Sequence, residues 1–231
     1  MSSRKIRVTH LTTGLEVGGA QTALRYLVSR ADRQMFDMDV VSLTSVGPIG
    51  EDLRRQGVRV DALEMKASRP NPLTVFKLMV ELQRRRTDIL QCWMYHADLL
   101  GALAGIPIRR TKVFWNLRQT NLDPSHSKPL TRATAYACSK LSRFVPHTIV
   151  CGSHAARDIH VEFGYDSRKM VVIENGVDVE KFAPSPESRR KLRQELGLSL
   201  GTKLIGLVAR FHPQKDHRTF IRMARIVRAN D

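Results

Sequence analysis

The sequence has few cysteines, few aromatic residues and fewer acidic residues than basic ones. Its three cysteines (Cys92, Cys138 and Cys151) form no Cys-x-x-Cys pair, so we predict neither a disulfide framework nor a metal site, as in proteins of a reducing cytosol. Aromatic residues make up 6% of the chain and are not interleaved with basic ones, which argues against a stacking platform for nucleic acid. The 38 basic residues exceed the 22 acidic ones and leave a net charge of +16. Such a charge favours an anionic partner.

Long apolar runs are also lacking. The basic N-terminus is followed by no apolar run of signal-peptide length, so we expect a cytoplasmic protein, with peripheral association at the inner face of the cell membrane as a further hypothesis. Residues 89–107 contain no Lys or Arg, but Gln91, His96 and Asp98 fall within them. Polar groups at mid-span are costly in lipid, and we therefore predict a strand followed by a buried helix instead of a membrane span.

Short apolar runs alternate with helical patterns along the first three quarters of the chain. The predicted strands are 4–11, 36–43, 58–63, 88–93, 112–116, 147–151 and 170–173, and the predicted helices are 20–31, 50–56, 73–86, 96–104, 129–142 and 154–163. This order predicts the α/β class, with a Rossmann-like parallel sheet covered by helices on both faces. Ligands of such sheets bind at the carboxyl ends of the strands.

The pattern changes after residue 173. Asn175-Gly176 and two prolines indicate a turn and a linker, which are followed by a polar helix over 187–196, a strand over 204–209 and a helix over 217–229. We therefore predict a domain over 1–178, a linker with a polar helix over 179–202, and the first β-α unit of a second Rossmann-like domain over 203–231.

Three groups of residues follow predicted strands. Gly18 and Gly19 precede the first helix, where glycine allows a diphosphate or a sugar to approach the backbone; a tight turn that needs glycine explains them equally well. His96 follows the fourth strand and Asn116 and Arg118 follow the fifth. A structural histidine and a surface arginine remain the simpler explanations for His96 and Arg118.

The third group lies near the C-terminus. Arg210 and Lys215 stand five positions apart before a helix, with Asp216 as a candidate N-cap. Two cations beside a helix N-terminus suit a departing diphosphate. Two solvated charges are the simpler explanation when the pair is taken alone.

Two longer strings carry a resemblance. Trp-Met-Tyr-His-Ala-Asp-Leu-Leu-Gly (93–101) and Arg-Phe-His-Pro-Gln-Lys-Asp-His (210–217), together with Gly18-Gly19 and Asn-Gly-Val-Asp (175–178), resemble glycosyltransferase family 4. The similarity is greatest to the branch that builds O-antigen and capsule polysaccharides, and it extends from about residue 4 to the last residue.

The resemblance implies a two-domain GT-B fold that retains configuration at the transferred sugar and needs no metal or other cofactor. Its partners would be a nucleotide-diphosphate sugar and a glycan or lipid-linked glycan acceptor, and no nucleic acid. Arg210 and Lys215 would stabilise the departing diphosphate, and His96 would orient a sugar. The remaining donor or acceptor contacts would be Gly18, Gly19, Asn116, Arg118 and Asn175.

The chain also departs from the family. Gln21 stands where the family often has glutamate, and Asn116-Leu117-Arg118 stands where many members have a histidine. Glu187 and Glu195 match the family's Glu-x7-Glu spacing but precede Arg210, so we interpret them as solvated helix charges. Most of a second domain is not in the sequence, which is also compatible with a catalytically silent fragment.

The net charge is compatible with two more kinds of partner. Nucleic-acid binding is disfavoured because the cations are dispersed and no binding motif is present; a steep salt dependence of binding would support it. An anionic membrane surface is the second, with cations flanking the stretch 133–141 as the candidate patch. These cations are Lys128, Arg132, Lys140 and Arg143.

Overall fold

The computed structural model describes residues 4–66, 72–124, 127–211 and 215–229. The chain divides into two compact units, Met1–Gly176 and Val177–Asp231. Each unit is described by itself below.

The first unit is built on a seven-stranded sheet in which every pair of neighbours is parallel. The strands are β1 (Ile6–Thr12), β2 (Phe36–Ser42), β3 (Arg59–Ala62), β4 (Ile89–Trp93), β5 (Lys112–Leu117), β6 (Thr148–Cys151) and β7 (Met170–Val172). Their order is β3-β2-β1-β4-β5-β6-β7. Strands β2 and β3 therefore lie on one side of the β1–β4 pair, and β5, β6 and β7 lie on the other. The predicted parallel sheet is confirmed.

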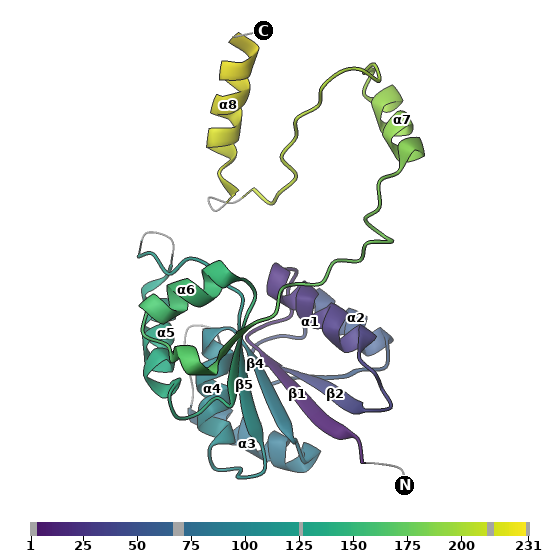
Figure 1. Ribbon diagram of the computed structural model, residues 1–231. Helices are drawn as coiled ribbons and strands as arrows, with labels where there is room; N and C mark the ends of the chain where they lie inside the picture. The colour runs from purple at the N-terminus through teal and green to yellow at the C-terminus, as the bar shows by residue number, and fades with distance from the viewer. Residues whose placement is uncertain (1–3, 67–71, 125–126, 212–214, 230–231) are drawn as a thin grey trace. The chain divides into compact units, whose positions relative to one another are not determined.

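Among the described residues of this unit, six α-helices cover the sheet. They are α1 (Gly19–Arg30), α2 (Gly47–Arg55), α3 (Pro72–Arg85), α4 (Tyr95–Gly105), α5 (Pro129–Leu141) and α6 (His154–Glu162). Figure 1 shows α1 and α2 on one side of the sheet and α4, α5 and α6 on the other. Two separate buried clusters match these sides: Leu24 of α1 and Leu53 of α2 belong to one cluster, and the buried apolar residues of α3 to α6 belong to the other.

Helix α4 packs closely on the strands beneath it. Eight of its residues are buried, which confirms a strand followed by a buried helix over 89–107. A Cβ placed on Gly101 would collide with Sγ of Cys92 and would lie 3.2 Å from Cδ2 of Leu11. The helix approaches the sheet this closely because position 101 has no side chain. Among the described residues, no helix has the length and apolar character needed to cross a bilayer.

Arg85, at the end of α3, is the centre of a buried ionic network. Its guanidinium pairs with Asp39 of β2 at 2.9 Å, with Asp61 of β3, and with Glu81 of α3 at 3.3 Å. Only 2% of the side chain is exposed. Burial raises the pKa of Asp39, against the opposing effect of Arg85. Arg85 therefore connects α3 to two strands.

The three cysteines are buried as free thiols in the larger cluster. Burial raises the pKa of all three, that of Cys151 to about 11. They are therefore neutral thiols at physiological pH.

The second unit contains α7 (Pro186–Glu195) and α8 (His217–Ala229). The predicted strand over 204–209 is wrong, because these residues have no regular secondary structure and Val208 is fully exposed. A strand needs a neighbouring strand to pair its backbone groups, and no strand occurs in the described part of 177–231. Arg193 is the one buried residue described in this unit, and its guanidinium donates to the backbone oxygens of Ser199 and Thr202.

Candidate functional site

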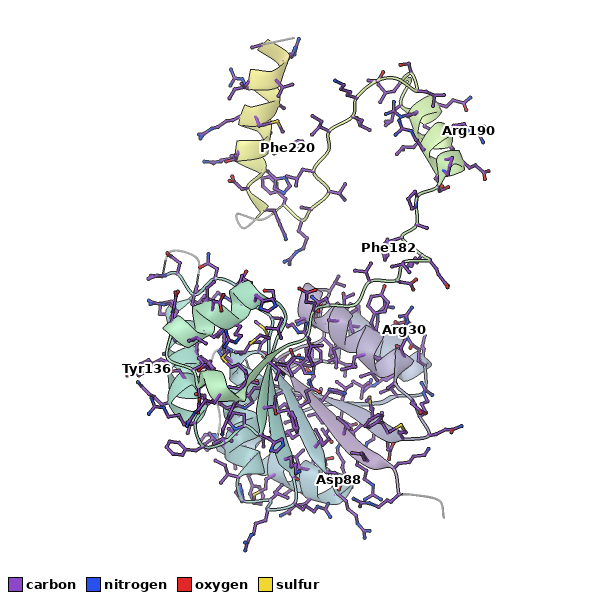
Figure 2. All side chains as sticks on the ribbon, in the orientation of Figure 1. Arg30, Asp88, Tyr136, Phe182, Arg190 and Phe220 are labelled. Carbon is purple, nitrogen blue, oxygen red and sulfur yellow. The ribbon has the colours of Figure 1, made fainter. Side chains whose placement is uncertain are left out.

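The carboxyl ends of the strands meet along one edge of the sheet. Thr12 of β1 is in register with Trp93 of β4, and Trp93 is in register with Asn116 of β5. The ends of the strands and the segments that follow them carry six of the residues predicted from the sequence: Gly18, Gly19, His96, Asn116, Arg118 and Asn175. Asp88, which precedes β4, lies at the opposite edge (Figure 2). The order of the strands reverses between β1 and β4, which is where open α/β sheets bind ligands.

The Gly18-Gly19 pair begins α1. Neither glycine has a positive φ, and Gly18 is the extended N-cap, with φ −166°. Apart from its chain neighbours and the backbone of α1, no described residue has an atom within 4 Å of a Cβ built on Gly19. A positive φ is therefore not the reason for this pair. A Cβ on Gly18 would lie 2.5 Å from Oε1 of Gln21, so the open space at the start of α1 is beside Gly19. No acidic residue occupies the first turn of α1, so this end of the helix suits an anion.

A buried histidine supports the end of β4. Trp93 donates its indole N–H to Nδ1 of His10 in β1 at 3.3 Å, and His10 is fully buried. Burial lowers the pKa of His10 to about 4. The hydrogen bond requires Nδ1 to be unprotonated, so the neutral ring keeps Trp93 in place. Sequence reasoning missed this pair; the signal was a polar residue at an inward position of an apolar strand.

Met94 joins β4 to α4 in an unusual conformation. Its φ is 72° and its ψ is 159°, a region that residues other than glycine rarely adopt and that is found mostly where function requires it. Tyr95 is buried, and its hydroxyl lies 2.7 Å from Nε2 of His160 in α6. The turn leaves His96 half-buried at the edge, with no hydrogen bond to a described residue. Burial lowers the pKa of His96, which favours a neutral imidazole.

Asp98 lies beneath the same edge with no exposed surface. Burial raises the pKa of this carboxyl well above its usual range, while the nearby backbone N–H of Asn116 acts in the opposite direction. Neither carboxyl oxygen has a well-formed hydrogen bond among the described residues. The neutral acid is therefore the form that suits this position.

Arg118 connects three strand ends. Its Nε donates to Oδ1 of Asn116 at 2.7 Å, and its Nη1 donates to Oδ1 of Asn175 at 2.7 Å and to the carbonyl of Ile173 at 3.2 Å. The guanidinium carbon lies 5.6 Å from the ring centroid of Trp93. The predicted residues Asn116, Arg118 and Asn175 thus form one hydrogen-bonded group, although Asn175 is 57 positions from Arg118.

Arg210 and Lys215 belong to the second unit and are exposed. The carbonyl of Arg210 accepts a hydrogen bond from Nε2 of His217 at 2.8 Å. Asp216 accepts one from the backbone N–H of Thr219 at 3.2 Å, as expected of an N-cap. Residues 212–214 of the predicted motif lie outside the described residues. Their role, and that of Arg210 and Lys215, stays a prediction.

The family model described as Glycosyltransferase Family 4 matches residues 17–181, the greater part of the chain. The chain belongs to glycosyltransferase family 4. The resemblance seen in the sequence is therefore confirmed, and the first unit is the N-terminal domain of this family.

Two curated relatives align with almost the whole chain. The putative glycosyltransferase EpsF of Bacillus subtilis (strain 168) is 25% identical, and the alignment covers 97% of this chain and 59% of EpsF. The UDP-Gal:alpha-D-GlcNAc-diphosphoundecaprenol alpha-1,3-galactosyltransferase of Escherichia coli is 23% identical, with 98% and 59% covered. The chain therefore spans less than two thirds of the length of these relatives.

A solved structure shares the fold. Anabaena Alr3699/HepE in complex with UDP superposes with a TM-score of 0.69 at 21% identity, covering 83% of this chain and 50% of that protein. The first unit of this family 4 chain thus has the architecture of half a GT-B enzyme, and the predicted α/β class with a Rossmann-like parallel sheet is confirmed for this unit.

Two further expectations for this family 4 chain concern the Glu187/Glu195 pair and metal ligands. Glu187 and Glu195 are exposed on α7, as expected of solvated helix charges. The described residues contain no cluster of three or more His, Cys, Asp or Glu side chains suited to a metal ion.

The candidate membrane patch consists of residues in and next to α5. Lys140 lies over the ring of Tyr136 at 4.8 Å, and Tyr136 projects away from the sheet (Figure 2). Leu130 and Phe144 are also exposed, Phe144 by 81%. Membrane association stays a prediction.

Proposed function

We propose that this chain is the acceptor-side part of a glycosyltransferase that moves a sugar, with retention of configuration, from a nucleotide-diphosphate sugar to a glycan or lipid-linked glycan. The pathway would be the synthesis of a cell-surface polysaccharide such as O-antigen or capsule. The observation that carries this proposal is the match of the family model to residues 17–181, combined with the position of the family-like residues at one edge of the sheet.

The relatives support the choice of substrates. The Escherichia coli relative is named for transfer of galactose from UDP-Gal to a sugar on diphosphoundecaprenol. HepE has been solved in complex with UDP and with UDP-glucose. UDP-sugars and lipid-linked diphosphate acceptors are therefore the first substrates to test.

Catalysis would depend on stabilising the negative charge of the leaving nucleoside diphosphate. Arg210 and Lys215 would neutralise the negative charge that develops on the departing nucleoside diphosphate. The leaving phosphate oxygen would take the proton of the acceptor hydroxyl, so no separate base is required. A neutral His96 would donate a hydrogen bond to a sugar hydroxyl or accept one from it, and the open space at Gly19 would admit the diphosphate.

We further propose that residues 1–231 do not catalyse transfer alone. In the described part of 177–231, residues 204–211 are without regular structure and α8 has no buried residue. Ligand sites are concave, largely pre-formed and lined mostly by packed apolar side chains. The resemblance implies that the remainder of a second domain would supply them.

The test compares the purified chain with a fusion in which the 231 residues are followed by the part of EpsF that the alignment does not cover. We expect no transfer from radiolabelled UDP-sugars by the chain alone. We expect transfer with retention by the fusion, which Arg210→Ala reduces by about 100-fold or more. A folded fusion without transfer to glycan or lipid-linked acceptors, or turnover by the chain alone that survives Arg210→Ala, would overturn the proposal.

A further inference from the structure

Arg118 carries a positive charge that no acidic residue in the described part of the chain balances. The side chain is half-buried, and burial lowers its pKa. Its hydrogen-bond partners are two side-chain amides and a backbone carbonyl, all neutral. No carboxylate of the described residues lies within ion-pair distance. By contrast, Arg85 in the same unit is buried against three carboxylates. A half-buried charge without a counterion is costly.

The thiol of Cys151 does not balance this charge. A deprotonated Cys151 would be an anion close to Arg118 and would raise the pKa of the guanidinium. The thiol's own pKa is raised to about 11, mainly by burial. The thiol is therefore neutral at physiological pH, and the guanidinium is left without an anionic partner among the described residues.

The guanidinium is held in place from several sides. Asn116 fixes Nε, Asn175 and Ile173 fix Nη1, and the ring of Trp93 lies against the guanidinium. The backbone at Gly152 closes a further side, since a Cβ there would lie 2.9 Å from Cδ of Arg118. Nη2 donates to no described group. A fixed guanidinium with a free nitrogen is pre-organised to bind an oxyanion.

A helix N-terminus adds to the positive potential. Gly152 immediately precedes Ser153, the N-cap of α6, whose hydroxyl accepts from the N–H of Ala156 at 3.1 Å. The first turn of α6 contains no acidic residue. The partial positive charge of this helix end and the Arg118 guanidinium favour the same kind of ligand, a phosphate group.

We propose that Arg118, positioned by Asn116, Asn175 and Gly152, is a phosphate subsite that binds a phosphate group of the acceptor substrate. The acceptor class would then be a glycosyl or prenyl phosphate ester, and uncharged glycans would bind more weakly. This inference rests on the proposed function. The acceptor is favoured over the donor because Arg118 belongs to the acceptor-side unit, whereas Arg210 and Lys215 are assigned to the donor diphosphate.

The test measures binding directly and needs no catalysis. The indole N–H signal of Trp93 in the isotopically labelled, full-length chain is followed by NMR during titration with citronellyl diphosphate, UDP or uncharged citronellol; Trp115 serves as an internal reference. We expect the prenyl diphosphate to shift the Trp93 signal and to bind at least tenfold more tightly than UDP. Citronellol should have no effect.

Three variants complete the test. Arg118→Gln and Gly152→Ala should each weaken citronellyl diphosphate binding, the first by about tenfold or more. Gly152→Ala keeps the charge of Arg118 and only displaces the side chain. Arg109→Gln, a change at an exposed arginine before β5, should bind as the wild type does.

The outcomes separate the possibilities. Wild-type binding by folded Arg118→Gln, or no binding of any phosphate probe to the folded chain, would overturn the phosphate subsite. Equal or tighter binding of UDP would overturn its assignment to the acceptor and transfer it to the donor. Arg118-dependent binding of the diphosphate would stand even if the fusion enzyme failed to transfer sugar, so the two proposals fail separately.

Discussion

Replacement of His10 by glutamine should change how the stability of the protein depends on pH. His10 is fully buried with its pKa lowered to about 4 by burial, whereas an unfolded histidine titrates near 6.5. The unfolded chain therefore binds a proton between these values and the folded chain does not. Because the folded pKa is depressed, the stability linked to His10 is present above about pH 6.5 and is lost as the pH falls toward about 4.

The size of the effect follows from the two pKa values. Between about pH 7.5 and about pH 4.5, the linkage relation gives a loss of about 2.5 kcal/mol in the free energy of unfolding from His10 alone. His10→Gln removes this titration and keeps an acceptor for the indole N–H of Trp93. Burial also lowers the pKa of His96 and His160, but both remain in the variant, and their contributions cancel in the difference.

Urea unfolding of both proteins, followed by tryptophan fluorescence over the same pH range, measures this difference. The wild type should lose about 2.5 kcal/mol more than His10→Gln over that range. Two curves that stay parallel within about 0.5 kcal/mol would refute the reasoning, because uncertainty in a linear extrapolation is smaller than the predicted change. An NMR titration that shows His10 protonated at about pH 6 would do the same.

Two predictions concern packing in the first unit. Arg85→Ala removes a buried guanidinium, leaves the half-buried Asp39 without its ion-pair partner, and should lower the free energy of unfolding in urea by about 3 kcal/mol. Arg84→Ala, at the neighbouring exposed ion pair with Glu81, should cost less than about 1 kcal/mol, and equal losses would contradict the network. Gly101→Ala should lower stability by about 1–3 kcal/mol through contact with Cys92, although alanine favours helix. Cys92→Ala in the same chain should restore part of this loss, and simple additivity of the two changes would argue against the contact.

The secondary structure of the first unit could be predicted because it depends on local patterns. Each buried strand is a short apolar run, and each helix shows the periodicity of a face packed on a sheet. The stretch 204–209 has the same apolar pattern, yet it does not form a strand. Strand formation depends on a partner elsewhere in the chain, which a local pattern does not reveal.

The sequence predicts where in the fold the candidate site lies, but it does not predict the contacts of the residues in the site. The parallel sheet predicts that residues after β1, β4 and β5 share an edge, and His96 and Asn116 lie there. The environment of Arg118 could not be predicted, because it depends on Asn175 from a distant segment. The sequence alone favours a surface position for a lone arginine.

Two further features could not be predicted either. A basic residue at the end of a helix such as α3 is expected to complement the helix dipole, but Asp39 and Asp61 from two strands make Arg85 the centre of an ionic network. The conformation of Met94, with a φ of 72°, is likewise not indicated by the local sequence pattern.

The burial of Cys92, Cys138 and Cys151 means that labelling of these thiols can report local unfolding of the first unit. A thiol reagent reacts with thiolate, and these thiols are both shielded and neutral. Modification therefore has to wait until the cluster between α4, α5 and the sheet separates. The three cysteines come from β4, α5 and β6, so the order in which they become labelled would reveal which element leaves the core first.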